Sequence, residues 1–259
     1  MNLRRTGKSG CPNKVEIIAH RGASYDAPEN TLSAVRLGWE QGADAVEIDV
    51  HCSRDGKIVV IHDPTLRKLA RCSGKVRDKT LAELKQLDVG KWKHSRWAGE
   101  RIPVVEEVLE TIPRGKRLFI EIKCSADCVP ELARAIERSG ASPKSVVIIG
   151  FSLATMTDMK RARPDVESCW IVERKRKWHN GRWAPPADWV IERVRKARLD
   201  GVDMGMRGLH TEFVEEIKAA KLKCYVWTVD SPFFAARLIR AGIDGVTTNR
   251  PGWLREQLR

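Results

Sequence analysis

Residues 45–62 have the sequence AVEIDVHCSRDGKIVVIH, two apolar runs joined by a short polar stretch. The run Ala45–Val50 predicts one strand and the run Ile58–Ile61 predicts another. Only seven residues lie between the two runs, which is too few for the crossover helix that parallel neighbours need. Because Ser53-Arg54-Asp55-Gly56 is typical of a turn, we expect the two strands to form an antiparallel hairpin.

Outward from this hairpin, short apolar runs alternate with amphipathic stretches along the chain. The predicted strands are Val15–Ala19, Ala45–Val50, Ile58–Ile61, Leu118–Ile122, Val146–Phe151, Ser168–Val172, Val202–Met204, Lys223–Val229 and Gly245–Thr248. The predicted helices are Thr31–Gln41, Thr80–Leu87, Val104–Thr111, Val129–Ser139, Leu153–Arg161, Trp189–Ala197, Thr211–Ala220 and Pro232–Ala241. This alternation favours an α/β protein with a parallel sheet or barrel.

The length of 259 residues matches a single TIM (β/α)8-like barrel, which typically has about 250 residues. A barrel needs eight strands and nine are predicted, so one lies outside it. The two candidates are Ile58–Ile61 and Val202–Met204. Residues 15–259 are expected to form this one domain. Residues 1–14 form a basic tail without the apolar core of a secretory signal.

Two segments look inserted between the repeating elements. Pro64–Pro103 is long, polar and basic, with no clear strand, and Arg174–Asp188 holds Trp178, Trp183 and several charges. We expect both to lie over one end of the barrel. No run of about 18 apolar residues is present, so no transmembrane segment is expected.

Charge and cysteine content narrow the partners and the compartment. The net charge of +13 favours an anionic partner, such as a phosphodiester or a membrane surface that the protein contacts peripherally. Nucleic-acid binding is not expected, because no recognition module accompanies the charge. Seven cysteines without a CxxC pair indicate free thiols in a reducing compartment, and hence a cytoplasmic protein.

Acidic side chains stand inside otherwise apolar strands. Glu47 and Asp49 are two residues apart, so their side chains share one face of a strand. Two carboxylates so placed repel each other unless a cation lies between them, and oxygen ligands suit Mg²⁺ or Ca²⁺. The alternative is an edge strand that faces solvent, or an ion pair with arginine. Glu121 and Lys123 share a face in the same way at the end of another strand.

Two histidines follow apolar runs, where barrel active sites form. Register counting in the hairpin places His62 opposite Glu47, and His20 follows the first strand. An imidazole has a free pKa of about 6.5 and can take or give a proton at neutral pH. The other four histidines are interpreted as surface or loop residues: His51, His94, His179 and His210.

These segments together resemble the signature of the glycerophosphodiester phosphodiesterase family. The motifs are His20-Arg21-Gly22, Pro28-Glu29-Asn30-Thr31, Glu47-x-Asp49, His62-Asp63, Glu121-Ile122-Lys123, Phe151-Ser152, Val226-Trp227-Thr228-Val229 and Gly242 to Thr248. The resemblance covers about residues 15 to 253. Three positions depart from the family pattern: Ser53, Asp230 and Asn249, where the family often has Thr, Asn and Asp. We expect Asp230 and Asn249 to alter detail of the pocket.

The resemblance implies a fold, a reaction and a set of site residues. It implies a TIM barrel with a small region inserted after His62-Asp63, and hydrolysis of a glycerophosphodiester to glycerol 3-phosphate and an alcohol. The implied residues are Glu47, Asp49 and Glu121 for one divalent cation, His20 and His62 for general base and acid, Arg21 and Lys123 for the phosphate, Phe151 and Trp227 for the pocket wall, and Glu29 in support.

Two other functions remain open from the sequence. A related phosphodiesterase acting on lysophospholipids at a membrane would also fit the basic charge and the tryptophans. A non-catalytic binding module for anionic lipid or nucleic acid would have no need of the acid–base and metal set. The nucleophile is either water or the glycerol 2-hydroxyl.

Overall fold

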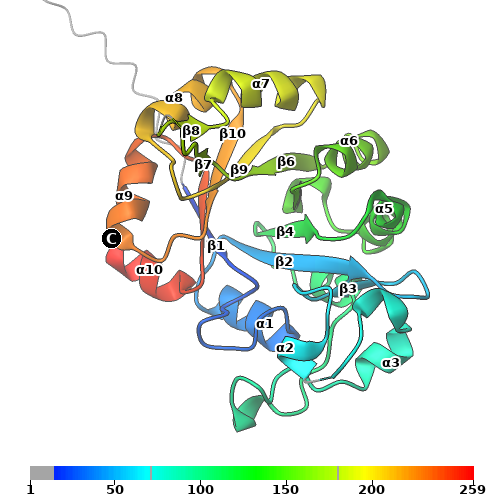
Figure 1. Ribbon diagram of the computed structural model, residues 1–259. Helices are drawn as coiled ribbons and strands as arrows, with labels where there is room; N and C mark the ends of the chain where they lie inside the picture. The colour runs from blue at the N-terminus through cyan, green and yellow to red at the C-terminus, as the bar shows by residue number, and fades with distance from the viewer. Residues whose placement is uncertain (1–14, 71, 180) are drawn as a thin grey trace, which may run out of the picture.

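The computed structural model describes residues 15–70, 72–179 and 181–259, and the predicted tail at 1–14 lies outside them. Eight parallel strands form a closed ring, because β1 pairs with both β11 and β2 (Figure 1). In order around the ring they are β2 (Ala45–Cys52), β4 (Arg117–Ile122), β5 (Val146–Gly150), β6 (Glu167–Val172), β9 (Gly201–Gly205), β10 (Lys223–Trp227), β11 (Gly245–Thr248) and β1 (Glu16–Ala19). The prediction of a TIM barrel is confirmed.

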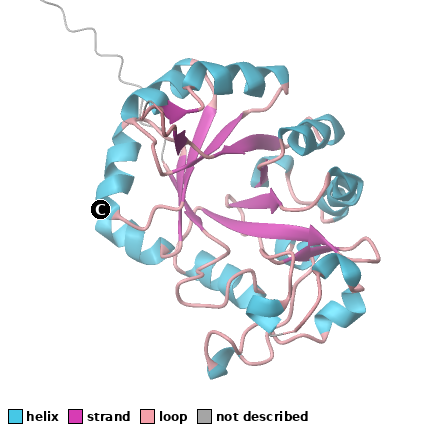
Figure 2. Ribbon diagram, in the orientation of Figure 1, coloured by secondary structure: helices cyan, strands magenta, loops and turns pink. Residues whose placement is uncertain are grey.

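Helices surround this ring of strands, as Figure 2 shows. They are α1 (Leu32–Glu40), α4 (Val105–Leu109), α5 (Val129–Arg138), α6 (Leu153–Ala162), α7 (Ala187–Lys196), α8 (Thr211–Ala219), α9 (Pro232–Arg240) and α10 (Pro251–Gln257). Thr31 caps α1, since its side chain accepts a hydrogen bond from the backbone N–H of Ala34, and Ser152 caps α6 in the same way. Such caps satisfy donors that the first turn leaves free.

The barrel interior is filled by side chains from alternate strand positions. A buried apolar cluster occupies its middle: Ile18, Ala45, Phe119, Val147, Ile149, Cys169, Ile171 and Tyr225. At the amino-terminal end, Arg117 donates to Glu16, Glu167 and Tyr225. These two layers fill the barrel from its middle to its amino-terminal end. The end left for a ligand is therefore the one at the carboxyl ends of the strands.

The hairpin predicted for residues 45–62 is present, and β3 (Ile58–Val60) pairs antiparallel with β2. It is therefore the predicted strand that lies outside the barrel, whereas Gly201–Gly205 is a full member. The predicted register was wrong by one residue, because Val50 pairs with Val60. The loop has three residues, closed by a bond from Ser53 N to Lys57 O and with Gly56 at a φ of 76°. Glycine tolerates this left-handed conformation.

The segment between β3 and α4 contains short helices and its own small core. The helices are α2 (Arg67–Ala70), η1 (Val76–Asp78), α3 (Leu81–Lys85) and η2 (Ser95–Trp97). The core consists of Val59, Ile61, Leu66, Leu69, Val76, Leu84, Val89 and Ile102. Further 3-10 turns are η3 (Ala126–Cys128) and η4 (Pro143–Ser145).

The segment 174–188 is not only loop, since β7 (Lys175–Arg176) and β8 (Trp183–Ala184) form a two-stranded antiparallel sheet. Alternation gave no signal for strands of two residues. Trp178, between these strands, is 95% exposed. No helix within the described ranges has the length and apolarity to cross a membrane.

Candidate active site

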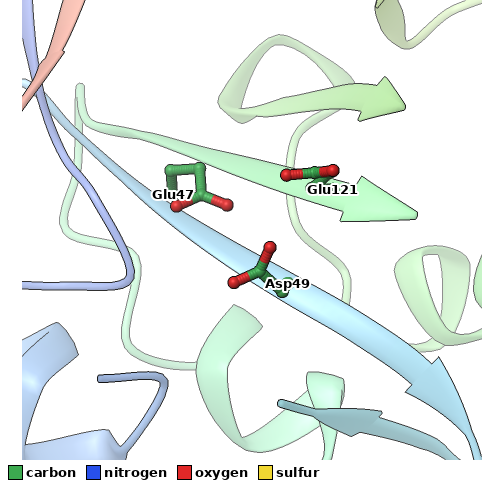
Figure 3. A group of neighbouring side chains, drawn as sticks. All are labelled: Glu47, Asp49 and Glu121. Atoms are coloured by element: carbon green, nitrogen blue, oxygen red, sulfur yellow. The ribbon is translucent and has the colours of Figure 1, made fainter. Parts of the chain in front are cut away.

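Three buried carboxylates converge at the carboxyl ends of two neighbouring strands. Glu47 and Asp49 extend from β2 and Glu121 from β4, where Asp49 and Glu121 are register partners. Figure 3 shows the three side chains pointing toward one another. One oxygen of each lies within 4.8 Å of the others, and none of the residues is more than 8% exposed.

The electrostatics of this cluster favour a bound cation. Burial raises the pKa of Glu47 well above its ordinary value, with the charges of Asp49 and Glu121 adding to the effect. Burial, then Asp49, raises the pKa of Glu121 to about 7. The Oε1 atom of Glu47 is buried and without a hydrogen-bond partner among the described residues. An oxygen-only donor set with an unsatisfied buried oxygen fits a hard divalent cation.

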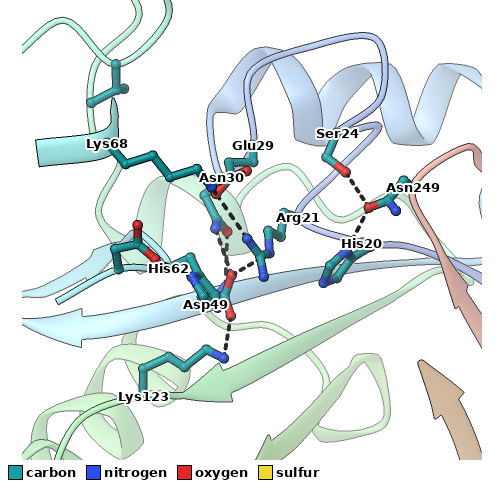
Figure 4. A network of polar contacts seen from close by, with 12 residues as sticks. His20, Arg21, Ser24, Glu29, Asn30, Asp49, His62, Lys68, Lys123 and Asn249 are labelled. Carbon is teal, nitrogen blue, oxygen red and sulfur yellow. Dashed lines mark hydrogen bonds and ion pairs between the residues drawn. The ribbon is translucent and has the colours of Figure 1, made fainter. Parts of the chain in front are cut away.

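Asp49 differs from its two neighbours, because cationic groups surround it (Figure 4). Its Oδ2 lies 3.2 Å from Nε of Arg21, and its Oδ1 lies 3.3 Å from Nζ of Lys123. Burial alone would raise the pKa of Asp49, but the charges of Arg21 and Lys123 outweigh it and lower that pKa. Asp49 is therefore the carboxylate that stays ionised without a metal ion.

Arg21 is held in place by a tight turn. Its φ is 56° and that of Gly22 is 79°, and the Arg21 backbone N–H donates to Oε2 of Glu47 over 2.8 Å. A Cβ on Gly22 would lie 2.4 Å from the carbonyl carbon of Ala34, so only glycine fits here. The Arg21 guanidinium donates to Glu29 at 3.0 Å, and Glu29 also contacts Lys68. Glu29 thus anchors Arg21.

His20 precedes Arg21 in the chain and is oriented by a series of hydrogen-bonded polar groups. Its Nδ1 is 2.8 Å from Oδ1 of Asn249, which also accepts from Ser24 Oγ. The Asn249 amide N–H in turn donates to Asp230 at 2.7 Å. An amide oxygen can only accept, so the His20 proton resides on Nδ1 and the Nε2 lone pair is free. Burial, then the charge of Arg21, lowers the pKa of His20 to about 4.

His62 is fixed by two contacts of its own. Its Nδ1 is 2.6 Å from Oδ1 of Asp63, and its carbonyl oxygen is 2.9 Å from Nε2 of His51. The prediction that His51 lies at the surface was wrong, since it is 7% exposed. It lies on β2 and shares the face of Glu47 and Asp49 by strand alternation, and the chain that follows β3 contacts its ring. His94, His179 and His210 are exposed, as predicted.

A cavity of about 160 Å³ joins these groups. It is lined by His20, Arg21, Glu47, His62, Glu121, Lys123, Ile149, Phe151, Ile171, Asp203, Trp227 and Thr247. Phe151 and Trp227 pack edge to face with ring centroids 5.8 Å apart. The Lys123 ammonium lies 2.6 Å from Glu121 and 5.5 Å from the Phe151 ring centroid. All predicted site residues thus lie on the cavity or directly behind it.

Comparison with known proteins accounts for this arrangement. The model of the glycerophosphoryl diester phosphodiesterase family matches residues 20–253. The chain belongs to this family. It is 35% identical to a glycerophosphodiester phosphodiesterase of Caldanaerobacter subterraneus subsp. tengcongensis, over 92% of this chain and 95% of that one. With a glycerophosphodiester phosphodiesterase of Bacillus subtilis it shares 28% identity over 93% of this chain and 85% of that one.

Solved structures agree with the sequence relatives. An Oleispira antarctica phosphodiesterase, solved in complex with the product sn-glycerol-3-phosphate, superposes with a TM-score of 0.85 and 29% identity, over 94% of this chain and 96% of that one. A Thermotoga maritima glycerophosphodiester phosphodiesterase gives 0.76 and 28%, over 95% and 99%. As a glycerophosphodiester phosphodiesterase, the chain is a phosphoric diester hydrolase.

Asn249 and Asp230 belong to one network in this phosphodiesterase. Asn249 and Asp230 are bonded to each other, and together they reach His20. An acid at 249 with an amide at 230 would place the charge beside His20. The exchange in this chain places it one group farther away. Both positions therefore bear on the charge beside the His20 imidazole.

Sequence reasoning missed several residues of the site, and two of them are polar groups close to the chemistry, Asn30 and Asp203. Asn30, at a φ of 59°, donates to Oδ2 of Asp49 at 2.8 Å and accepts from the Asp49 backbone N–H at 3.0 Å. Its place in the motif Pro-Glu-Asn-Thr was a usable signal for it. Asp203 lies on a strand that was doubted, and alternation within β9 would have pointed it inward.

Proposed function

We propose that this protein hydrolyses glycerophosphodiesters to glycerol 3-phosphate and an alcohol, with one divalent cation, Mg²⁺ or Ca²⁺, and two histidines that move the protons. The observation that supports the proposal best is the meeting of three carboxylate oxygens within 4.8 Å on a cavity that two imidazoles also line. The product complex of the Oleispira antarctica relative is consistent with it.

Glu47, Asp49 and Glu121 would hold the cation, which when bound stabilises negative charge on a phosphate oxygen. Arg21 and Lys123 flank the same carboxylates. They would neutralise the other oxygens of the phosphate as charge builds in the transition state. Phe151 and Trp227 would form the apolar wall of the substrate pocket, and Glu29 would keep Arg21 in position.

The two histidines have different surroundings, and these support different roles. His20 is neutral at pH 7 with a free Nε2, which suits a general base. His62 has the Asp63 carboxylate at Nδ1, a contact that would orient its ring as the general acid for the leaving alkoxide. The nucleophile is water or the glycerol 2-hydroxyl, and phosphorus NMR distinguishes them, because the second route passes through a cyclic phosphate.

A second substrate class has one observation in its favour. Trp178 and Phe233 are 95% and 70% exposed, and exposed aromatic side chains with basic neighbours are typical of contact with a membrane interface. Hydrolysis of a lysophospholipid is therefore the alternative activity, with peripheral membrane contact.

The free thiols among the described cysteines support the predicted cytoplasmic location.

The test is hydrolysis of glycerophosphocholine, beside a lysophosphatidylcholine, by protein treated with EDTA and then given Mg²⁺ or Ca²⁺. We expect EDTA to abolish hydrolysis and one of the ions to restore it. His20→Ala and His62→Ala should each lose roughly 10²–10⁴-fold in kcat, whereas His94→Ala at the exposed His94 serves as the matched control. Full activity in either active-site variant would remove that histidine from the mechanism.

A further inference from the structure

Asp203 is a buried acid in the active-site cavity that the proposed mechanism does not use. It lies on β9, which is four strands from β2 in either direction around the ring and so faces the metal-binding carboxylates across the barrel. The residue is 2% exposed and lines the cavity. Its Oδ1 atom has no hydrogen-bond partner within the described ranges.

The register partners of Asp203 on the two neighbouring strands supply no donor to its carboxyl group. Its register partners are Ile171 on β6 and Tyr225 on β10. Ile171 is apolar, and the Tyr225 hydroxyl donates to Glu167 toward the amino-terminal end. Arg21 and Lys123 are engaged with Glu29, Asp49 and Glu121.

Asp203 does not belong to the group of carboxylates that could bind a metal ion either. In the described part of the chain, the group able to hold an ion is Glu47, Asp49 and Glu121, and Asp203 does not join it. Burial raises the pKa of Asp203 well above its usual range, with Glu121 as a second cause. A buried polar group with no protein partner, facing a cavity, calls for a partner that arrives with the ligand.

A second polar group on the same wall is also without a partner. The Nε1–H of Trp227, on β10, is buried and bonds to no described residue. Trp227 is two residues beyond Tyr225, the register partner of Asp203. Both side chains therefore point inward from neighbouring strands, one layer apart. The wall offers one donor and one carboxyl group, and a hydroxyl group can satisfy both because it donates and accepts.

We propose that Asp203, with Trp227 Nε1–H beside it, binds the glycerol hydroxyls of the substrate and is a specificity-determining residue of this enzyme. The inference rests on the proposed function, which places the phosphate among Arg21, Lys123 and the three carboxylates on the facing wall. With the phosphate there, the glycerol moiety of the substrate would face β9 and β10. Its hydroxyls supply what the two unpartnered groups lack.

The test compares two ligands that differ only in hydroxyl groups. Calorimetry with Mg²⁺ or Ca²⁺ present measures the Kd of sn-glycerol 3-phosphate and of propyl phosphate. In the unaltered protein we expect glycerol 3-phosphate to bind about 10- to 100-fold more tightly, as for loss of hydrogen bonds to a buried carboxyl group. Asp203→Val should reduce this ratio to below about 3, and Asp203→Asn, which still bonds hydroxyls, should keep part of it.

Controls separate recognition from packing. Val147→Ala alters the apolar cluster in the middle of the barrel and should leave the ratio of the two Kd values unchanged. An unaltered protein that binds both ligands equally would overturn the inference without any variant, and so would an equal loss of both ligands in Asp203→Val. Failure of the unaltered protein to hydrolyse glycerophosphocholine with either ion would instead overturn the proposed function, and this inference with it.

Discussion

Replacing Asn249 with aspartate changes the charge on the group that orients His20. The Asn249 Oδ1 atom lies 2.8 Å from His20 Nδ1, and burial, then Arg21, lowers the pKa of His20 to about 4. A carboxylate at hydrogen-bond distance favours the charged imidazolium and typically raises the pKa of a histidine by about 1–3 units. In this protein Asp230 stands behind Asn249 at 2.7 Å. The two carboxylates would repel each other, so we expect the lower part of that range.

The direction in which the pH profile of kcat/KM moves follows from the role of His20 as a base. A neutral His20 is needed, so kcat/KM falls as the pH drops through the pKa of His20. Asn249→Asp raises that pKa and should therefore move the acid limb of the profile upward by about 1–2 pH units. The double variant Asn249→Asp with Asp230→Asn restores an amide donor behind the new carboxylate, and its acid limb should move farther, by about 2–3 units.

The assay is kcat/KM for glycerophosphocholine between pH 4 and 9 at saturating metal ion. Loss of the cation at low pH would also produce an acid limb, because Glu47 and Glu121 must be ionised to bind it. Repeating the profile at tenfold higher metal concentration separates the two causes, since only a metal-binding limb moves with concentration. If the limb is independent of metal and the same in the parent and both variants, His20 is not the base.

Further predictions concern the metal site and the turn that carries Arg21. Asn30→Ala removes two hydrogen bonds from Asp49 and should raise the metal concentration for half-maximal activity about 10- to 100-fold. The control Ser142→Ala, before the amino-terminal end of β5, should leave that concentration unchanged. Glu121→Gln should weaken metal binding further, and an unchanged calorimetric affinity would contradict its place in the cluster. Gly22→Ala should cost several kcal/mol of unfolding free energy, whereas Gly56→Ala, at a similar φ with open space around it, should cost about 1–2 kcal/mol; equal melting temperatures would refute the steric reasoning.

The barrel and the catalytic candidates followed from the sequence because they depend on local patterns. Alternation along β2 predicts that Glu47 and Asp49 share a face, whatever the rest of the chain does. Strand–helix alternation then predicts a parallel barrel, in which the carboxyl ends of the strands meet. Those two rules are sufficient to bring Glu121 and His20 to the same place.

Contacts that depend on exact register or on irregular backbone could not be predicted in this way. The hairpin loop holds three residues, so His62 is not opposite Glu47 and reaches the cavity only after β3 has ended. Asn30 reaches Asp49 from a left-handed backbone conformation in a loop. His51 is buried where the chain after β3 contacts its ring, a tertiary effect that residue type does not reveal.

The most direct test of the metal centre is a crystal structure of the protein with Mn²⁺ and sn-glycerol 3-phosphate, with anomalous scattering to locate the metal. We expect one peak at roughly 2.0–2.5 Å from carboxylate oxygens of Glu47, Asp49 and Glu121, with the imidazoles of His20 and His62 on either side of the phosphate. A peak at any other set of ligands, or imidazoles turned away from the phosphate, would contradict the proposed centre.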